Sequence, residues 1–262
     1  MLKRLMPTVY RLDLAYEGTD FRGWAKQPGQ RTVEGELERA LRIVVREHVR
    51  LSVAGRTDAG VHALAQVASF RLARDDIEPR RLRLALNALL PPDVAVLDAA
   101  RAADDFDARA ARARTYRYRI WLPEARPVFE RRYVWALRGA QRLNRDALAR
   151  CAALLLGRRN FAALTPSAHL YRSCERTISE AVWAVANDGR EITFTITGDS
   201  FLHNMVRVAV GSMVDVALGR LTEAAFAAGL ASGRRGQMGQ TAPAHGLALV
   251  RVSYGMPADL SA

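Results

Sequence analysis

The order of strand and helix patterns in this chain of 262 residues predicts an α+β fold with mostly antiparallel sheets. The clearest sign is a pair of long strand patterns, residues 176–186 and 191–197, joined by Asn187-Asp188-Gly189-Arg190. Such a short polar turn with glycine is a strong β-hairpin signal. Strands come in runs rather than alternating singly with helices, which favours α+β over a parallel βαβ fold. A similar inventory of strand, helix, hairpin and helix occurs twice, so we expect two halves, residues 1–108 and 109–262.

The first half is expected to contain a strand, a helix, a hairpin and a second helix. Strand patterns cover residues 8–14, 49–54 and 64–72, and helix patterns cover residues 33–46 and 79–89. Thr32 is a candidate N-cap for the first helix, because its hydroxyl can accept from a free backbone N–H. Pro91 and Pro92 end the second helix, since proline has no N–H with which to continue it.

The second half is expected to carry longer strands and a buried helix. Strand patterns cover residues 115–122, 132–137, 176–186 and 191–197, and helix patterns cover residues 202–218 and 223–231. A further helix begins after Asn144, a candidate cap, and ends near Gly157. The most apolar stretch of the chain, residues 201–218, is interrupted by polar and charged residues. This interruption predicts a core helix and excludes a membrane span.

The charge of the chain indicates its class of partner. Lysine and arginine number 39 against 27 acids, which gives a formal net charge of +12. A surplus of this size favours a polyanion, nucleic acid first and an anionic membrane surface second. The planar guanidinium of arginine grips phosphates with two hydrogen bonds and stacks on bases. We therefore expect a nucleic acid partner and no membrane.

Cysteine and histidine spacing offers no site for a metal. Cys151 and Cys174 are the two cysteines and form no CxxC pair, and the five histidines are scattered without an HExxH pattern. Neither a zinc site nor a disulfide framework is predicted. The N-terminus lacks the apolar core of a signal peptide, so the expected location is the cytoplasm.

The most informative segment is Gly55-Arg56-Thr57-Asp58-Ala59-Gly60-Val61-His62. It places one carboxylate in a turn bracketed by two glycines, between two strand patterns. Glycine permits a tight turn and a close approach of a ligand to the backbone. A carboxylate on such a rigid support suits a nucleophile or a general base. The alternative is an Asx-turn, in which the aspartate side chain bonds only its own backbone.

This segment resembles the signature of the A family of tRNA pseudouridine synthases, in which the aspartate is the nucleophile. Three further segments resemble the family in the same chain order, and a fifth lies near the C-terminus. They are residues 16–24 (Tyr-Glu-Gly-Thr-Asp-Phe-Arg-Gly-Trp), Tyr116-Arg117-Tyr118, residues 201–207 (Phe-Leu-His-Asn-Met-Val-Arg) and residues 241–247 (Thr-Ala-Pro-Ala-His-Gly-Leu). The likeness spans residues 16 to about 254. It implies two related α+β halves whose sheets meet at a central basic cleft.

The resemblance implies an isomerase that converts uridine to pseudouridine at positions 38, 39 and 40 of the tRNA anticodon stem-loop. It also implies a homodimer in which one tRNA touches both subunits. The reaction breaks the N1–C1′ bond, turns the base and rejoins it through C5. No group or electron is exchanged with another molecule, so no cofactor is expected. Asp58 is the expected nucleophile; attack on C1′, addition to C6 and removal of a ribose proton all stay open.

Two arginines are expected to support Asp58. Arg207 lies in a helix pattern of apolar residues, where an unpaired guanidinium would cost several kcal/mol. We expect it to hold the Asp58 carboxylate ionised, as the resemblance also implies; the alternatives are solvent or Asp215. Arg56 is expected to bind a phosphate beside the target or to fill the space left by the flipped base. The alternative for Arg56 is a solubilising surface charge.

Tyr116 is the expected stacking platform for the flipped uracil. Tyr116 and Tyr118 share one face of a predicted strand, and either one can instead be core packing. The motif alignment implies Tyr116, and it implies Leu247 or Leu249 as the apolar residue that closes the pocket. The expected track for tRNA consists of basic residues, namely Arg22, Lys26, Arg31 and the arginines from Arg109 to Arg119.

Two other functions are compatible with these features. One is a pseudouridine synthase for other tRNA positions or for ribosomal RNA. The other, from a different class, is a non-catalytic RNA-binding or RNA-folding module. The intact Asp58 segment argues against the module, which has no need of a poised carboxylate.

Overall fold

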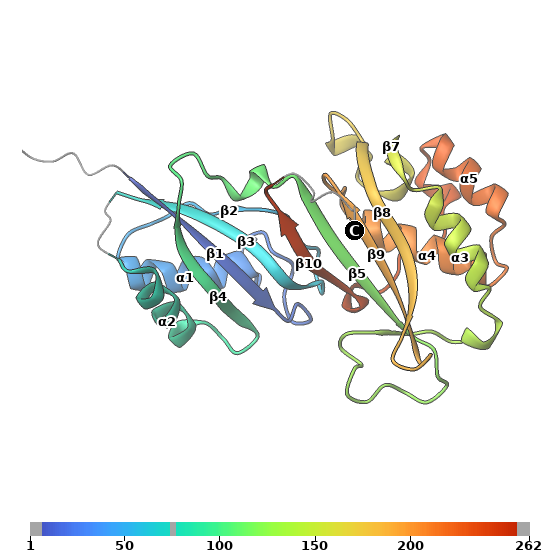
Figure 1. Cartoon of the computed structure of the whole chain (residues 1–262), viewed down its shortest axis with the longest axis horizontal. Helices are drawn as coiled ribbons and strands as arrows, with labels where there is room; N and C mark the ends of the chain where they lie inside the picture. Colours follow the sequence, from blue (N-terminus) through green and yellow to red (C-terminus); the bar gives the residue numbers. More distant parts are fainter. Residues whose placement is uncertain (1–6, 74–76, 256–262) are drawn as a thin grey trace, which may run out of the picture. The chain divides into compact units, whose positions relative to one another are not determined.

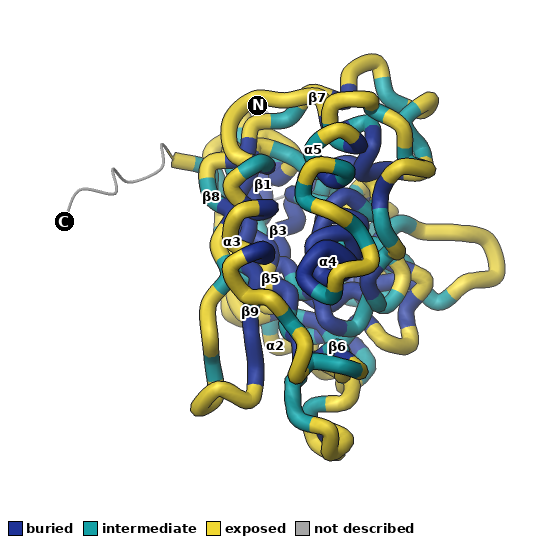
Figure 2. Tube along the Cα trace, turned by 90° about the vertical axis from the view of Figure 1, so that its right-hand side faces the viewer, coloured by how far each residue is buried: buried dark blue, intermediate teal, exposed yellow. Residues whose placement is uncertain are grey.

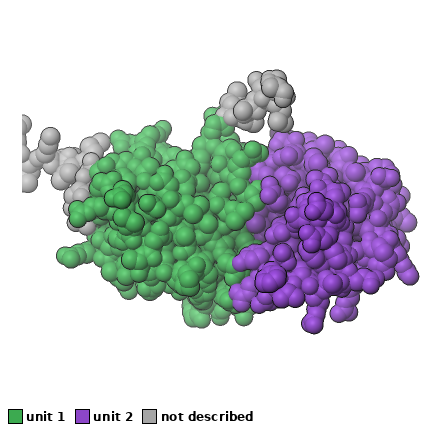
Figure 3. Space-filling model, turned by 60° about the horizontal axis from the view of Figure 1, so that its bottom comes forward, with its two compact units in different colours: residues 1–114, 249–262 green, residues 115–248 purple. Residues whose placement is uncertain are grey.

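The computed structural model describes residues 7–73 and 77–255. The chain forms two compact units, residues 1–114 with 249–262 and residues 115–248, which are coloured separately in Figure 3. The change between the units falls at Arg114, whereas the sequence pattern had suggested residue 108. The last strand returns to the first unit because it lies beside a strand from that unit, a pairing that no local pattern reports.

The first unit is built on an antiparallel sheet. Its strands are β1 Thr8–Tyr16, β2 Ser52–Val53, β3 His62–Leu72, β4 Val94–Ala102 and β10 Leu247–Ser253. The strand order is β4-β1-β3-β10, and β2 pairs with β3 (Figure 1). β4 was not expected from the sequence. Its alanine-rich pattern is weak by itself, but it pairs antiparallel with β1 along nearly its whole length, from Val9↔Ala102 to Tyr16↔Val94.

Two capped helices accompany this sheet. They are α1, Val33–Val45, and α2, Pro79–Leu89. The Thr32 hydroxyl accepts from the Gly35 N–H, as its candidate role as N-cap requires. Glu78 caps α2 through the Arg81 N–H, a cap that the sequence analysis missed. α2 packs against β4 and against α1 (Figure 1).

The second unit combines a sheet with three helices. Its strands are β5 Ala113–Trp121, whose first two residues count with the first unit, β6 Trp135–Ala136, β7 Gly157–Asn160, β8 Glu175–Ala186 and β9 Glu191–Gly198. The order is β5-β9-β8-β7, and the short β6 pairs in parallel with β5. β8 and β9 form the expected hairpin, in which Asn187, Asp188 and Gly189 all take positive φ.

The helices of this unit are α3 Arg145–Ala153, α4 Met205–Ala217 and α5 Glu223–Ser232. α4 is buried along nearly all of its length, with α3 and α5 packed on it (Figure 2). It begins later than the pattern predicted because Asn204 adopts a left-handed conformation with φ 60°. Short 3₁₀ helices cover Ala108–Ala110, Ala140–Arg142, Ala162–Leu164, Ala168–Leu170, Arg235–Gln237 and Ala244–Gly246. In the described parts of the chain, no helix is both long and apolar enough to cross a membrane.

These elements confirm the predicted α+β class with mostly antiparallel pairing. Three local differences have a common cause. The strand pattern at 49–54 is a strand only at Ser52–Val53, and the pattern at 132–137 is one only at Trp135–Ala136. The helix expected to reach Gly157 ends at Ala153, and Gly157 opens β7 instead. In each case the partner strand, which is β3, β5 or β8 respectively, decides how many residues pair.

Candidate functional site

Asp58 lies in the loop between β2 and β3. Ala54 N donates to Val67 O at 2.9 Å and closes the base of this loop. The turn itself is closed by the backbone, since Val61 N donates to the Asp58 carbonyl at 3.1 Å and Gly60 has φ 78°. The backbone itself therefore closes the turn that carries the carboxylate. Asp58 is half-buried, and the neighbouring Arg56 is exposed.

The segment from Tyr16 to Trp24 forms the wall behind this loop. Trp24 N donates to the Thr57 carbonyl at 3.0 Å, and Gly60 N donates to the Phe21 carbonyl at 3.2 Å. Gly23 has φ 91°, and a Cβ there would lie 2.8 Å from the Thr57 carbonyl oxygen. A side chain at this position would push the loop away, so glycine is required. The two motifs that carry the family resemblance thus pack directly on each other.

A buried network of neutral polar groups holds the Asp58 loop in place. The Tyr16 hydroxyl lies 2.7 Å from Thr57 Oγ1. Gln66 Nε2 donates to the Tyr16 hydroxyl at 3.2 Å and to the Gly55 carbonyl at 2.6 Å. Burial raises the pKa of Tyr16 to about 12, so its hydroxyl stays neutral. The network therefore holds both residues that flank Arg56.

Sequence reasoning missed Gln66 and the role of Tyr16. Gln66 is fully buried in β3, among apolar neighbours. A glutamine in an otherwise apolar strand pattern was the available signal, because a buried amide needs hydrogen-bond partners. His62 is also buried there, and its Nδ1 accepts from Gly18 N at 2.9 Å. This bond ties the Tyr16–Trp24 segment to the start of β3.

In the second unit, β5 places Tyr116 and Tyr118 in different surroundings. Tyr118 is fully buried, donates from its hydroxyl to the Pro243 carbonyl at 2.8 Å, and packs so closely that Gly246 has no room for a Cβ. Burial raises its pKa. Tyr118 is therefore core packing. Tyr116 is also buried, and its ring meets Phe201 edge to face with centroids 5.1 Å apart.

Arg207 sits in the first turn of α4 and is half-buried. Its Nε donates to the Ala242 carbonyl at 2.9 Å, and its Nη1 donates to Asn204 Oδ1 at 2.7 Å. Asp215, the alternative partner suggested by the sequence, accepts instead from Arg220 and from the amide and side chain of Gln240. These two bonds orient the guanidinium of Arg207.

The C-terminal segment that holds Arg207 also leads to the candidate pocket leucines. Ala242 N donates to the Arg207 carbonyl at 3.0 Å, so the contact between the segment and α4 is reciprocal. Burial and the nearby Arg207 charge lower the pKa of His245. Leu247 and Leu249 are both buried, and their spacing places them on the same face of β10. Burial therefore does not distinguish between them.

The basic track expected from the sequence is wrong as a continuous surface. Arg114 is buried and donates to the carbonyls of Ala54, Ala111 and Arg109. A guanidinium in a buried strand must satisfy its donors internally, so this side chain does not face a ligand. Arg119 makes two hydrogen bonds to Glu191, and Arg31 makes two to Asp93. Arg22 and Arg117 do remain exposed.

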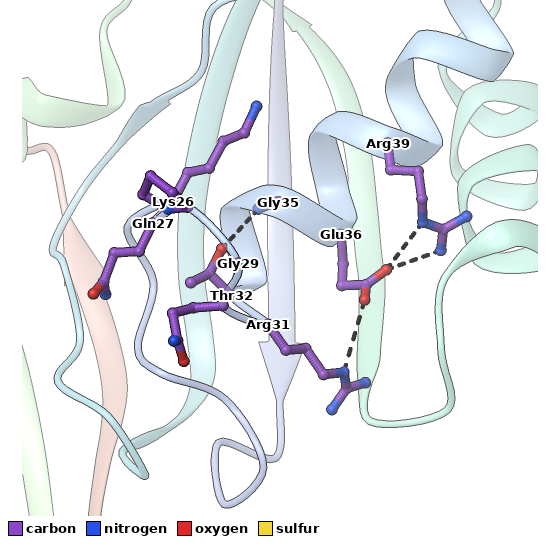
Figure 4. A pocket seen from close by; sticks show the side chains of 10 residues that line it. Lys26, Gln27, Gly29, Arg31, Thr32, Gly35, Glu36 and Arg39 are labelled. Atoms are coloured by element: carbon purple, nitrogen blue, oxygen red, sulfur yellow. Dashed lines mark hydrogen bonds and ion pairs between the residues drawn. The ribbon is translucent and has the colours of Figure 1, made fainter.

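A hollow at the start of α1 shows the same internal pairing. Figure 4 shows Arg31 and Arg39 directed at the same carboxylate, that of Glu36. Lys26, on the opposite side, pairs with Glu38 at 2.7 Å. The cations of this hollow are therefore neutralised by the protein itself, and the hollow is a poor candidate for binding a polyanion.

Comparison with known proteins gives a consistent result. The sequence profile of the family described as "tRNA pseudouridine synthase" matches residues 14–109 and 151–255. A protein of Moorella thermoacetica named tRNA pseudouridine synthase A is 42% identical over 252 residues, 95% of this chain and 100% of that protein. Proteins of the same name from Halalkalibacterium halodurans and a Bradyrhizobium species are 38% and 41% identical. They cover 90% and 94% of this chain and 89% and 99% of their own lengths.

Proposed function

We propose that Asp58 is the catalytic nucleophile of this chain, which belongs to the tRNA pseudouridine synthase family. The chain is an isomerase that converts uridine to pseudouridine in tRNA. The observation that carries the proposal is the loop of Asp58. Its turn is closed by backbone atoms, and it is held by the Tyr16–Trp24 segment and by the buried network of Tyr16, Thr57 and Gln66. Such support holds the backbone of Asp58 in a fixed position, as a positioned nucleophile needs.

The nucleophile must stay ionised in a site that excludes water. Desolvation alone would favour the protonated, inert carboxyl, and an arginine opposes this effect. Arg207 is the proposed partner of Asp58. Its orientation by Ala242 and Asn204 supports this role, because a guanidinium that is already aimed loses less freedom when it binds a carboxylate.

The remaining roles concern the flipped nucleotide. Tyr116 is the proposed stacking platform, and its edge-to-face contact with Phe201 supports this by fixing the ring plane. Arg56, exposed beside Asp58, is proposed to contact the RNA at the extruded base, as a phosphate ligand or in the vacated stack. Leu247 is proposed to close the pocket, with Leu249 as the alternative.

The anticodon stem-loop, positions 38 to 40, is the proposed target. A homodimer and a cytoplasmic location are part of the same proposal, and both derive from the family resemblance. Action at several neighbouring positions fits recognition of tRNA shape and backbone better than readout of sequence. The net charge of +12 supports a binding mode dominated by phosphates, with affinity that falls as salt rises.

Pseudouridine mapping on unmodified tRNA tests this proposal. Wild-type protein is expected to modify positions 38 to 40, and Asp58→Ala is expected to bind the tRNA without modifying it. Modification at other positions would keep Asp58 as nucleophile and transfer the activity to the second candidate, a synthase with other RNA targets. Modification by Asp58→Ala at the wild-type rate would overturn the assignment of Asp58.

A further inference from the structure

We propose that a hollow beside the Asp58 loop, lined by Arg50 and Arg56, binds the sugar–phosphate backbone of the RNA substrate. The hollow has a volume of about 540 Å³ and lies within the first unit. It is lined by the run from Arg50 to Arg56, by Glu34 and Glu38 of α1, by Arg109 before β5 and by Arg114 at the start of β5. The inference deepens the proposed function and rests on it, because that function supplies the RNA.

The charges of the hollow are unevenly paired. Both of its acids already have partners, since Glu38 pairs with Lys26 Nζ and Glu34 accepts from Lys26 N, each at 2.7 Å. Arg50 and Arg56 are exposed, and neither makes a hydrogen bond or ion pair with any residue that the structure describes. The hollow therefore offers two unused guanidinium groups and no unused carboxylate.

The floor of the hollow is rigid. The buried Arg114 donates to the carbonyls of Ala54, Ala111 and Arg109, and these bonds hold its guanidinium in place. Asp107 is occupied by Arg109, with which it forms an ion pair at 2.6 Å. Bonds from Arg114 to Ala54 also anchor the start of the loop that carries Arg56. A surface that is both fixed and positive suits an anion that must be held in register.

The placement of the two arginines fits a nucleic acid strand better than an isolated anion. Arg50 and Arg56 lie at the two ends of the run that lines the hollow, on either side of β2. Two separate cations along one run match phosphates at different positions of a nucleic acid backbone. Arginine binds each of them with two parallel hydrogen bonds. Because Arg56 is two residues from Asp58, the bound backbone would be that which flanks the target uridine.

The test measures binding of unmodified tRNA as a function of salt for wild type, Arg50→Ala, Arg50→Lys and the control Arg81→Ala. Arg81 is an exposed arginine of α2 whose side chain has no partner among the described residues, so its loss removes the same charge elsewhere. One lost phosphate contact reduces the slope of log affinity against log salt by about 0.7 to 0.9. We expect this reduction for Arg50→Ala. The ratio of wild-type to variant affinity should therefore be about fourfold larger at 0.15 M salt than at 1 M salt.

The outcomes separate this inference from the proposed function. A slope for Arg50→Ala equal to that for Arg81→Ala would overturn the hollow as an RNA site, even if wild-type protein modifies tRNA normally. A reduced slope, restored by Arg50→Lys, supports the site. If wild-type protein binds tRNA with this Arg50 dependence but forms no pseudouridine, the proposed function fails while the binding site stands. Because Arg50 is exposed and makes no hydrogen bond or ion pair with any described residue, its replacement should leave folding intact.

Discussion

The Asp58 loop and the surroundings of Arg207 are fixed by different means. Buried side chains hold the first: the hydroxyls of Tyr16 and Thr57 and the amide of Gln66. Close backbone contact holds the second, since a Cβ on Gly211 of α4 would lie 2.0 Å from the Gln240 carbonyl oxygen. The first region should therefore be sensitive to loss of a polar atom. The second should be sensitive to added volume.

The largest expected effect concerns Asp58, the proposed nucleophile. Asp58→Asn keeps the shape of the side chain and removes its charge. We expect turnover to fall by about 10⁴-fold or more, since a neutral amide is no nucleophile. Single-turnover assays of pseudouridine formation measure this loss. Near-normal turnover would mean that the loop is merely well packed.

Added volume in the second region is tested by Gly211→Ala. The new methyl group would meet the backbone of Gln240 and displace the segment that holds Arg207. We expect a loss of about 2–3 kcal/mol in the free energy of unfolding, measured with urea, because packed backbone yields poorly.

Gly236→Ala is the matched control for this change. Gly236 has no atom within 4 Å of the position that a Cβ would take. An equal destabilisation of both variants would remove close contact as the cause.

The chemistry of the second region is tested by Arg207→Lys. Lysine keeps the charge but loses the planar fork that bonds Ala242, Asn204 and, as proposed, the Asp58 carboxylate. We expect kcat/KM to fall by about 10²-fold, comparable to loss of one positioned hydrogen-bond donor. Arg220→Lys serves as the control and should have little effect, because the Arg220 side chain is largely exposed where it pairs with Asp215.

Loss of a polar atom in the first region is tested by Tyr16→Phe. It removes the buried partner of Thr57 Oγ1 and one of the two acceptors of Gln66 Nε2, which costs about 1–2 kcal/mol of folding free energy. We expect kcat to fall with little change in KM, because the loop moves while the binding surface stays. Tyr254→Phe removes a comparable hydroxyl, bonded to the Ala108 carbonyl, and should cost stability without this change in kcat.

The buried Tyr16 hydroxyl should also make stability depend on pH. The pKa of Tyr16 is raised from 10.0 to about 12, so the folded state favours the neutral hydroxyl. Its contribution to stability is complete below pH 10 and is lost as the pH rises towards 12, by about 2–3 kcal/mol in all. Unfolding curves of wild type and Tyr16→Phe should therefore converge in this range. A constant difference up to pH 12 would contradict the burial of this hydroxyl.

Local sequence signals predicted helix caps and turns well. The Thr32 and Asn144 caps and the turn at residues 187–190 occur as predicted, because each depends on a few neighbouring residues. The segment around Asp58 indicated a rigid support for a carboxylate, and its loop has that character. β4 and Gln66 escaped prediction because their partners, β1 and the Gly55 carbonyl, come from other parts of the chain.

The sequence by itself determined the α+β class, most of the strands and helices, the family and the basic character of this protein. These properties reside in periodicity, composition and short motifs, all of which are local. Tertiary structure alone decided which arginines are buried and bonded within the protein and which stay exposed. Arg114 lies under the Asp58 loop with its donors bound to carbonyls, whereas Arg50 and Arg56 stay exposed. The physical reason is that pairing and burial depend on which distant groups meet a side chain, and residue type does not record this.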